Sequence, residues 1–186
     1  MGLFLGLTPF IAFFLMMRLV SPMAGLVSAL GVSALLSAWM YRSGKSIKIL
    51  EIGSLLLFGA LVLYTWIAAP RWTVATVRLA VDAGLLAIVL ISLVIGKPFT
   101  LQYAREQVAR EFWSSPQFLA ANRLITAAWA GAFAVLVAAD AAAEYLTWIP
   151  VGVDAAVSVA AFLAAVGFTI WYPTVIRRRA LARGSG

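Results

Sequence analysis

Apolar residues fill this chain in about six long blocks, and short polar intervals separate them. The blocks cover about residues 3–17, 23–41, 49–69, 73–95, 116–148 and 151–172. A helix that crosses the hydrocarbon core of a bilayer needs roughly 20 apolar residues, and about 17 is the lower limit. The first block is close to that limit and the others reach or exceed it. The pattern therefore predicts an all-α, polytopic transmembrane bundle of about six spans.

Composition excludes a water-soluble protein. The chain has 186 residues, of which 64% are hydrophobic and only 11% are charged. A soluble domain is typically about half apolar and about a quarter charged. No polar stretch is long enough for a second domain, so we expect a single integral membrane domain over residues 1–183. Residues 184–186 (Gly-Ser-Gly) look like a cloning remnant.

The chain contains no cysteine and no histidine. Thiolate nucleophiles and thiolate metal sites are therefore excluded, as are disulfides. The commonest general base and the commonest transition-metal ligand are also missing. We accordingly expect no catalytic residues, no metal site and no cofactor.

The net charge of +7 indicates membrane topology rather than nucleic-acid binding. Basic residues gather in three alternate polar intervals, at 42–48, at 97–110 and in the tail at 177–183, whereas the interval at 140–154 is acidic. Cytoplasmic loops of membrane proteins carry an excess of lysine and arginine. Six spans with both termini in the cytoplasm agree with this alternation.

The longest polar interval, residues 96–123, predicts a short amphipathic helix at the membrane surface, between spans four and five. One apolar face would run over residues 100–113 and consist of Leu101, Ala104, Val108 and Phe112. Thr100 is the expected N-cap. The polar side chains expected at this interface are Lys97, Arg105, Arg110, Asn122 and Arg123. Arg123 would extend toward water, with Glu51 as a candidate partner.

Arg78 and Asp82 are charged residues inside the fourth block. If Trp72 marks the outer interface, Asp82 lies roughly 15 Å deep, near the midplane. A lone charge at that depth costs on the order of 3 kcal/mol, so a pair that faces the bundle interior is expected. Residues four apart on a helix can pair. A structural ion pair is the favoured interpretation, and an ion, proton or anionic-headgroup site is the alternative.

Small and aromatic residues inside the blocks predict close helix packing. The second block contains Gly25, Ser28, Gly31 and Ser33, and small residues at such spacings let helices approach closely. Trp129 and Trp171 are expected to pack in the core. The i,i+4 acids Asp140 and Glu144 are expected to be solvated at the outer end of the fifth block.

Several short motifs resemble the intracellular septation protein A family of bacterial inner-membrane proteins. They are the Pro-anchored, Phe-rich stretch at residues 8–14, Gly96-Lys97-Pro98, and the order Pro116, Asn122, Trp129-Ala130, Phe133. The resemblance implies a multi-pass protein of the inner membrane with a role in envelope integrity and cell division. It implies no chemistry. The charges at 78 and 82 are not part of the family pattern.

Three functions follow as expectations. The favoured one is a non-enzymatic envelope protein that binds lipids or partner membrane proteins, with a homodimer left open and nucleic acid excluded. The alternative is a small-solute or ion transporter or channel with its site at Arg78 and Asp82. An intramembrane enzyme is third, because only acids such as Asp140 and Glu144 could act in it, and nothing positions a nucleophile.

Overall fold

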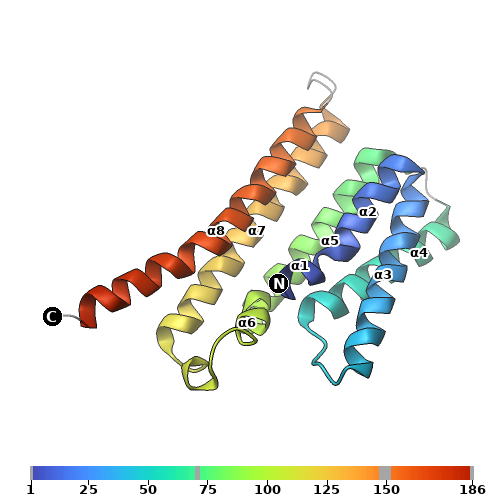
Figure 1. Ribbon diagram of the computed structural model, residues 1–186. Helices are drawn as coiled ribbons and strands as arrows, with labels where there is room; N and C mark the ends of the chain where they lie inside the picture. Colours follow the sequence, from blue (N-terminus) through green and yellow to red (C-terminus); the bar gives the residue numbers. More distant parts are fainter. Residues whose placement is uncertain (1, 70–71, 147–151, 185–186) are drawn as a thin grey trace.

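The structure is a computed structural model that describes residues 2–69, 72–146 and 152–184. It is 84% helix, and no strand occurs within those three segments. The elements are α1 (Gly2–Gly6), α2 (Thr8–Leu19), α3 (Pro22–Arg42), α4 (Ile49–Ala68), α5 (Val74–Val94), α6 (Phe99–Ala104), the 3₁₀ turn η1 (Arg110–Phe112), α7 (Pro116–Tyr145) and α8 (Val153–Gly184) (Figure 1).

The all-helical fold class is confirmed, and several helices are those of a multi-pass membrane protein. Five helices, α3, α4, α5, α7 and α8, are long and apolar enough to cross a membrane. The first predicted span is divided instead. It consists of α1 and the 12-residue α2, which are separated at Leu7. Pro9 follows in the first turn of α2, where its missing N–H has no helical partner to lose. The sixth span therefore stays a prediction.

Side-chain caps explain where the long helices begin. Ser21 accepts a hydrogen bond from the backbone N–H of Ala24 and starts α3. Ser115 does the same for Phe118, and Pro116 follows it as the first residue of α7. A hydroxyl at this position satisfies one of the four N–H groups that a helix start leaves unpaired. The start of α7 at Ser115-Pro116 agrees with the sequence pattern.

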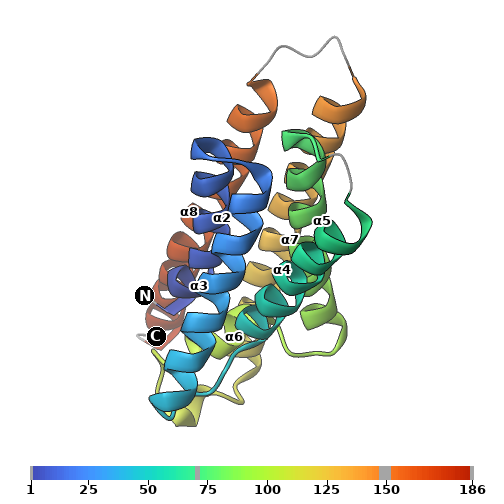
Figure 2. The ribbon, with the colours of Figure 1, turned by 90° about the vertical axis from the view of Figure 1, so that its right-hand side faces the viewer.

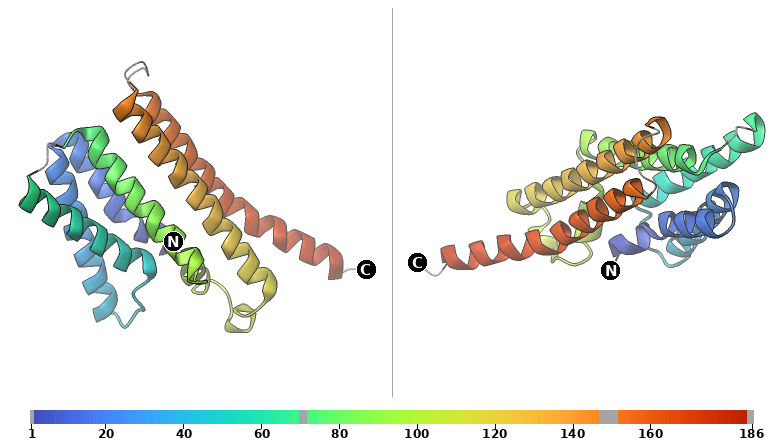
Figure 3. Two further views of the ribbon diagram at one scale, coloured as in Figure 1. Left: turned by 180° about the vertical axis from the view of Figure 1, so that it is seen from behind. Right: turned by 90° about the horizontal axis from the view of Figure 1, so that it is seen from above.

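Neighbouring helices along the chain pack side by side and run in opposite directions. Contacts join α2 to α3, α3 to α4, and α4 to α5. A long hairpin of α7 and α8 packs through α7 against α5 (Figures 1 and 2). Beyond the hairpin contact, the C-terminal part of α8 extends past the other helices (Figure 3). The loop between α3 and α4 lies at the same end of the molecule as α6 (Figure 1).

Trp129 is the centre of the core between α6, α7 and α8. Its fully buried ring meets Phe99 and Phe162 edge-on, and its indole N–H donates to Oγ1 of Thr169 at 2.9 Å. The prediction of core packing is confirmed for this residue. It is wrong for Trp171, which is 59% exposed on the outer face of α8.

Close packing of α2 on α3 depends on one glycine. A Cβ at Gly25 would lie 2.9 Å from both the carbonyl oxygen of Phe13 and the Cβ of Met17. At Gly31 the same substitution meets open space. The small-residue prediction therefore holds at Gly25, where a backbone group of the neighbouring helix leaves no room, and not at Gly31.

The interfacial helix predicted over residues 100–113 differs from the structure. Helix α6 ends at Ala104, a turn follows, and η1 begins at Arg110. Thr100 is not a cap, because its hydroxyl is buried and donates to the backbone oxygen of Asn122. The physical reason is that residues of this segment bond to the start of α4 instead of facing solvent. Gln102, for example, accepts the backbone N–H of Ile49 at 2.8 Å.

Candidate functional site

Arg78 of α5 connects three helices in the half of the bundle that holds the α2–α3 turn. Its Nη1 donates to Oδ2 of Asp154 on α8 at 2.5 Å, and Nη2 lies 3.5 Å from Oγ of Ser158, one turn further along α8. Nη2 also forms an ion pair with Asp140 of α7. Arg78 itself is buried. A buried guanidinium requires such partners, since an unpaired charge inside a membrane protein is costly.

Asp82 was expected to pair with Arg78, but it lies beside Asp140 in this cluster. Within the described residues, the ion pairs of Arg78 are made with Asp140 and Asp154, from other helices. Asp82 is half-buried one turn along α5, and its carboxyl adjoins that of Asp140. The two residues singled out from the sequence thus share a site, although the salt bridges run to long-range partners.

The expectation that Asp140 and Glu144 are solvated is wrong for Asp140. This residue is 1% exposed, and neither of its carboxylate oxygens receives a well-aligned hydrogen bond, although Nη2 of Arg78 is in contact. Glu144 lies one turn nearer the helix end and accepts from the hydroxyls of Thr73 and Thr76 at 2.9 and 3.0 Å. The reason is that α7 packs against α5, and Asp140 contacts the buried Arg78 there instead of water.

The cluster contains more carboxyl groups than cationic groups. Asp82, Asp140 and Asp154 surround one guanidinium, and Asp82 lies about 12 Å along α5 from Val74. Like charges so close repel strongly where the dielectric constant is low. The site can therefore accommodate added positive charge, as a proton or as a cationic group, better than added negative charge.

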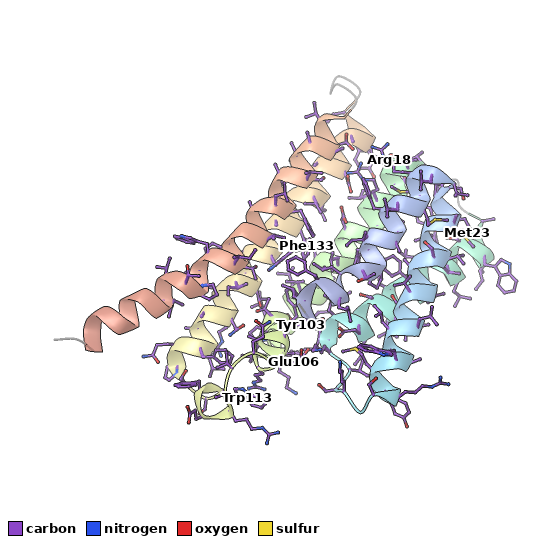
Figure 4. All side chains as sticks on the ribbon, viewed as in Figure 1. Arg18, Met23, Tyr103, Glu106, Trp113 and Phe133 are labelled. Carbon is purple, nitrogen blue, oxygen red and sulfur yellow. The ribbon has the colours of Figure 1, made fainter. Side chains whose placement is uncertain are left out.

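A groove of about 290 Å³ opens beside this cluster, between α2, α5, α7 and α8. Thirteen of its sixteen lining residues are apolar, and the polar ones are Arg78, Asp82 and Ser158. The apolar residues are Leu7, Phe10, Ile11, Phe13, Phe14, Leu15, Val81, Leu85, Phe133, Leu136, Val159, Phe162 and Leu163. Phe133 lies between the α7–α8 hairpin and the other helices (Figure 4). An apolar pocket with a few convergent polar groups is the usual form of a small-molecule site.

Sequence reasoning missed two members of this site, Asp154 and Ser158. They are four residues apart, and such residues lie on one face of a helix. That spacing was a usable signal. Nothing local, however, connects them to Arg78, which is 76 residues from Asp154.

A second polar cluster joins α4 to α6. The buried Glu51 accepts from the backbone N–H of Lys48 at 3.0 Å and from the hydroxyl of Tyr103 at 2.9 Å. Lys48 forms an ion pair with Glu106, 2.9 Å from Nζ to Oε1. Tyr103 and Glu106 lie close together in Figure 4. Glu51 is therefore not the partner of Arg123. Burial, followed by the negative charge of Glu51, raises the pKa of the Tyr103 phenol above its ordinary range.

Three of the five predicted interfacial residues lie together, and the other two lie apart from them. Lys97, Arg105 and Arg123 line one cavity at the end of α5. Arg110 lies 5.6 Å from the ring of Trp113. Asn122 is buried and donates from Nδ2 to the backbone oxygen of Phe118, so it is a structural residue of α7.

Comparison with known proteins identifies no relative. No protein-family model, curated protein or solved structure matches the chain. Among the described residues, no group of three or more acidic side chains is arranged to hold a metal ion. The function is therefore argued from the groove and its charges.

Proposed function

We propose that this protein binds an amphiphilic lipid inside the membrane, with an apolar chain in the groove and the polar part at Arg78, Asp82 and Ser158. The observation that carries this proposal is the lining, in which thirteen apolar residues are combined with three polar ones at one place. Aromatic residues contribute much of the apolar surface. The absence of cysteine and histidine also favours binding over catalysis.

The polar end of the groove decides which lipids bind. Lipid tails are as apolar as leucine, so moving a chain from the bilayer into the groove gains little hydrophobic free energy. Selection then depends on packing and on hydrogen bonds to the polar residues. Because carboxyl groups outnumber the guanidinium in this cluster, the favoured ligand has a neutral or cationic polar part that donates hydrogen bonds, such as a hydroxyl or an amine.

A groove-filling variant tests this proposal. Val159 lines the groove and is partly exposed, so Val159→Trp adds volume at its rim without overpacking a closed core. Leu56→Trp is the matched control, because Leu56 is exposed on α4 and does not line the groove. Native mass spectrometry of the protein in mixed lipid micelles measures the retained lipid. Val159→Trp is expected to lose lipid that the wild type and Leu56→Trp retain, and equal retention in all three refutes the proposal.

The excess of carboxyl groups favours a second candidate, a transporter for protons or small organic cations. Asp82 lines the groove next to the buried Asp140, so a cation that enters the groove would reach both. Proteoliposomes with a pH-sensitive dye inside measure this activity. Asp82→Asn should abolish a proton flux that Glu144→Gln preserves. The absence of any flux in wild-type vesicles excludes this second candidate and leaves lipid binding untouched.

Location and topology are also part of the proposal. Six spans with both termini in the cytoplasm agree with the basic intervals and with the antiparallel order of the helices. The family resemblance supports the bacterial inner membrane and a role in envelope integrity and division, with other membrane proteins or a second copy of the chain as partners. Loss of septation or envelope defects on deletion of the gene would test that role.

A further inference from the structure

A second cavity of about 240 Å³ lies at the C-terminal end of α5, far along the helix from Arg78. It is formed where α5 ends, α6 begins and the first turns of α7 pass. Its lining consists of Gly96, Lys97, Pro98, Leu101, Gln102, Arg105, Leu119 and Arg123. The lipid-binding groove shares none of these residues.

Three of the lining residues are cations, and none is acidic. Within the described segments, Lys97, Arg105 and Arg123 make no ion pair. The neighbouring acid, Glu106, pairs with Lys48 on the α4 side. Three uncompensated positive charges around one cavity repel each other, and an anion between them would remove that repulsion.

Arg105 has a hydrogen-bond donor without an acceptor. Its Nε is buried and has no partner, and a buried unsatisfied N–H is costly. The guanidinium is held over the ring of Trp113 at 5.3 Å, and the indole N–H of Trp113 is itself fixed by a bond of 2.9 Å to the backbone oxygen of Val108. The guanidinium of Arg105 is therefore held in place where it lines the cavity. A phosphate oxygen is the acceptor that guanidinium geometry fits well.

We propose that this cavity binds the phosphate of an anionic phospholipid headgroup. The three cations would surround the phosphate, and Gln102 would contribute a further polar contact. The rest of the lining supports a lipid over free phosphate, since Pro98, Leu101 and Leu119 provide apolar surface for the glycerol and the first chain carbons. The cavity also lies at the end of a helix that is long enough to span the membrane. This inference does not depend on the proposed groove ligand.

Charge-removing variants at the cavity, with matched controls, test the proposal. Arg105→Gln and Lys97→Gln remove cavity cations. Arg42→Gln and Lys45→Gln remove cations from the end of α3 and from the α3–α4 loop, at the same end of the molecule. Native mass spectrometry of the full chain in micelles compares binding of phosphatidylglycerol with that of phosphatidylcholine. One basic residue near an anionic surface changes binding about fivefold through charge alone. Arg105→Gln is expected to weaken phosphatidylglycerol binding about twentyfold, because it also removes directed hydrogen bonds.

Further arms of the experiment separate the alternatives. Millimolar inorganic phosphate should leave the bound lipid in place. Displacement of the lipid by phosphate would refute the claim that the cavity binds a lipid headgroup rather than free phosphate. Equal losses in cavity variants and loop variants overturn the site, since they would indicate diffuse attraction. Lys97→Arg keeps the charge and should retain binding within about twofold, which guards against a folding defect in Lys97→Gln. No preference for phosphatidylglycerol in the wild type also overturns the proposal.

Discussion

Replacing Arg78 by methionine is expected to destabilise the protein more than replacing any one of its carboxylate partners. Arg78→Met leaves three carboxyl groups without their common cation. Asp140→Asn leaves Arg78 still paired with Asp154. A symmetric two-residue ion pair would lose similar stability from either side, so the inequality is specific to the observed arrangement.

The magnitudes follow from burial. Breaking a buried ion pair by removing one partner costs about 3–5 kcal/mol. Arg78→Met belongs at the upper end of that range, because it leaves three carboxyl groups without a cation. Asp140→Asn belongs at the lower end, because Arg78 keeps its ion pair with Asp154, but it stays within the range because Asp140 is 1% exposed. The side chain of Asp154 is 18% exposed and lies in the first turn of α8, where a negative charge is favourable by about 1 kcal/mol. Asp154→Asn should therefore cost only about 1–2 kcal/mol.

A double-mutant cycle measures these energies. Unfolding in mixed micelles with increasing dodecyl sulfate, followed by far-UV circular dichroism, gives the stability of Arg78→Met, Asp140→Asn and the double variant. The coupling between the two substitutions is expected to be about 2 kcal/mol, because contacting residues in one network do not contribute additively. Glu144→Gln is the control on the same helix. Glu144 accepts hydrogen bonds from Thr73 and Thr76, so the stability loss in Glu144→Gln should add to that in Arg78→Met.

Two results would refute this reasoning. Additive losses for Arg78→Met and Asp140→Asn would mean that the ion pair contributes no net interaction. A stronger coupling of Arg78 to Asp82 than to Asp140 would restore the local i,i+4 pair as the main interaction.

Three further predictions concern packing, the α4–α6 contact and topology. Gly25→Ala should destabilise the protein by about 1–3 kcal/mol, whereas Gly31→Ala should be neutral or stabilise by up to about 1 kcal/mol, in the same unfolding assay. Tyr103→Phe should cost about 1–2 kcal/mol by leaving Glu51 short of a donor. Because the folded chain holds the Tyr103 proton more tightly than the unfolded chain, stability should fall as the pH rises past about 10, and less steeply in Tyr103→Phe. A phosphatase reporter fused to the end of α8 should be inactive and a fluorescent-protein reporter active, and the reverse would contradict the cytoplasmic C-terminus.

Local sequence signals predicted the parts of the fold that depend on neighbours along the chain. Ser115-Pro116 starts α7 because a hydroxyl cap and a proline act within one turn. Arg78 and Asp82 stand out because charge inside an apolar block is rare. Trp129 was predicted to pack in the core because it lies deep inside an apolar block, and it is fully buried there.

Tertiary contacts decided what the sequence could not show. The i,i+4 rule selects Asp82 as the partner of Arg78, yet the observed ion pairs reach Asp140 and Asp154 on other helices. Amphipathic spacing predicted a helix through residue 113, but Gln102 bonds to the start of α4 and the helix ends at Ala104. In both cases a local preference worth a few tenths of a kcal/mol competes with buried, directed contacts worth several times more.

The two proposed sites require different ligands in different halves of the molecule. From Arg78 to Val94 the helix α5 rises about 24 Å, and the basic cavity begins just beyond its end. The hydrocarbon core of a bilayer is about 30 Å thick, so the chains of a lipid in one leaflet extend over about 15 Å. A single phospholipid cannot reach both sites. The cluster beside the groove has three carboxyl groups around one guanidinium, so it disfavours the anionic headgroup that the three cations of the cavity attract. Losses of lipid caused by Val159→Trp and by Arg105→Gln should therefore add independently, and the lipids lost should differ in headgroup charge.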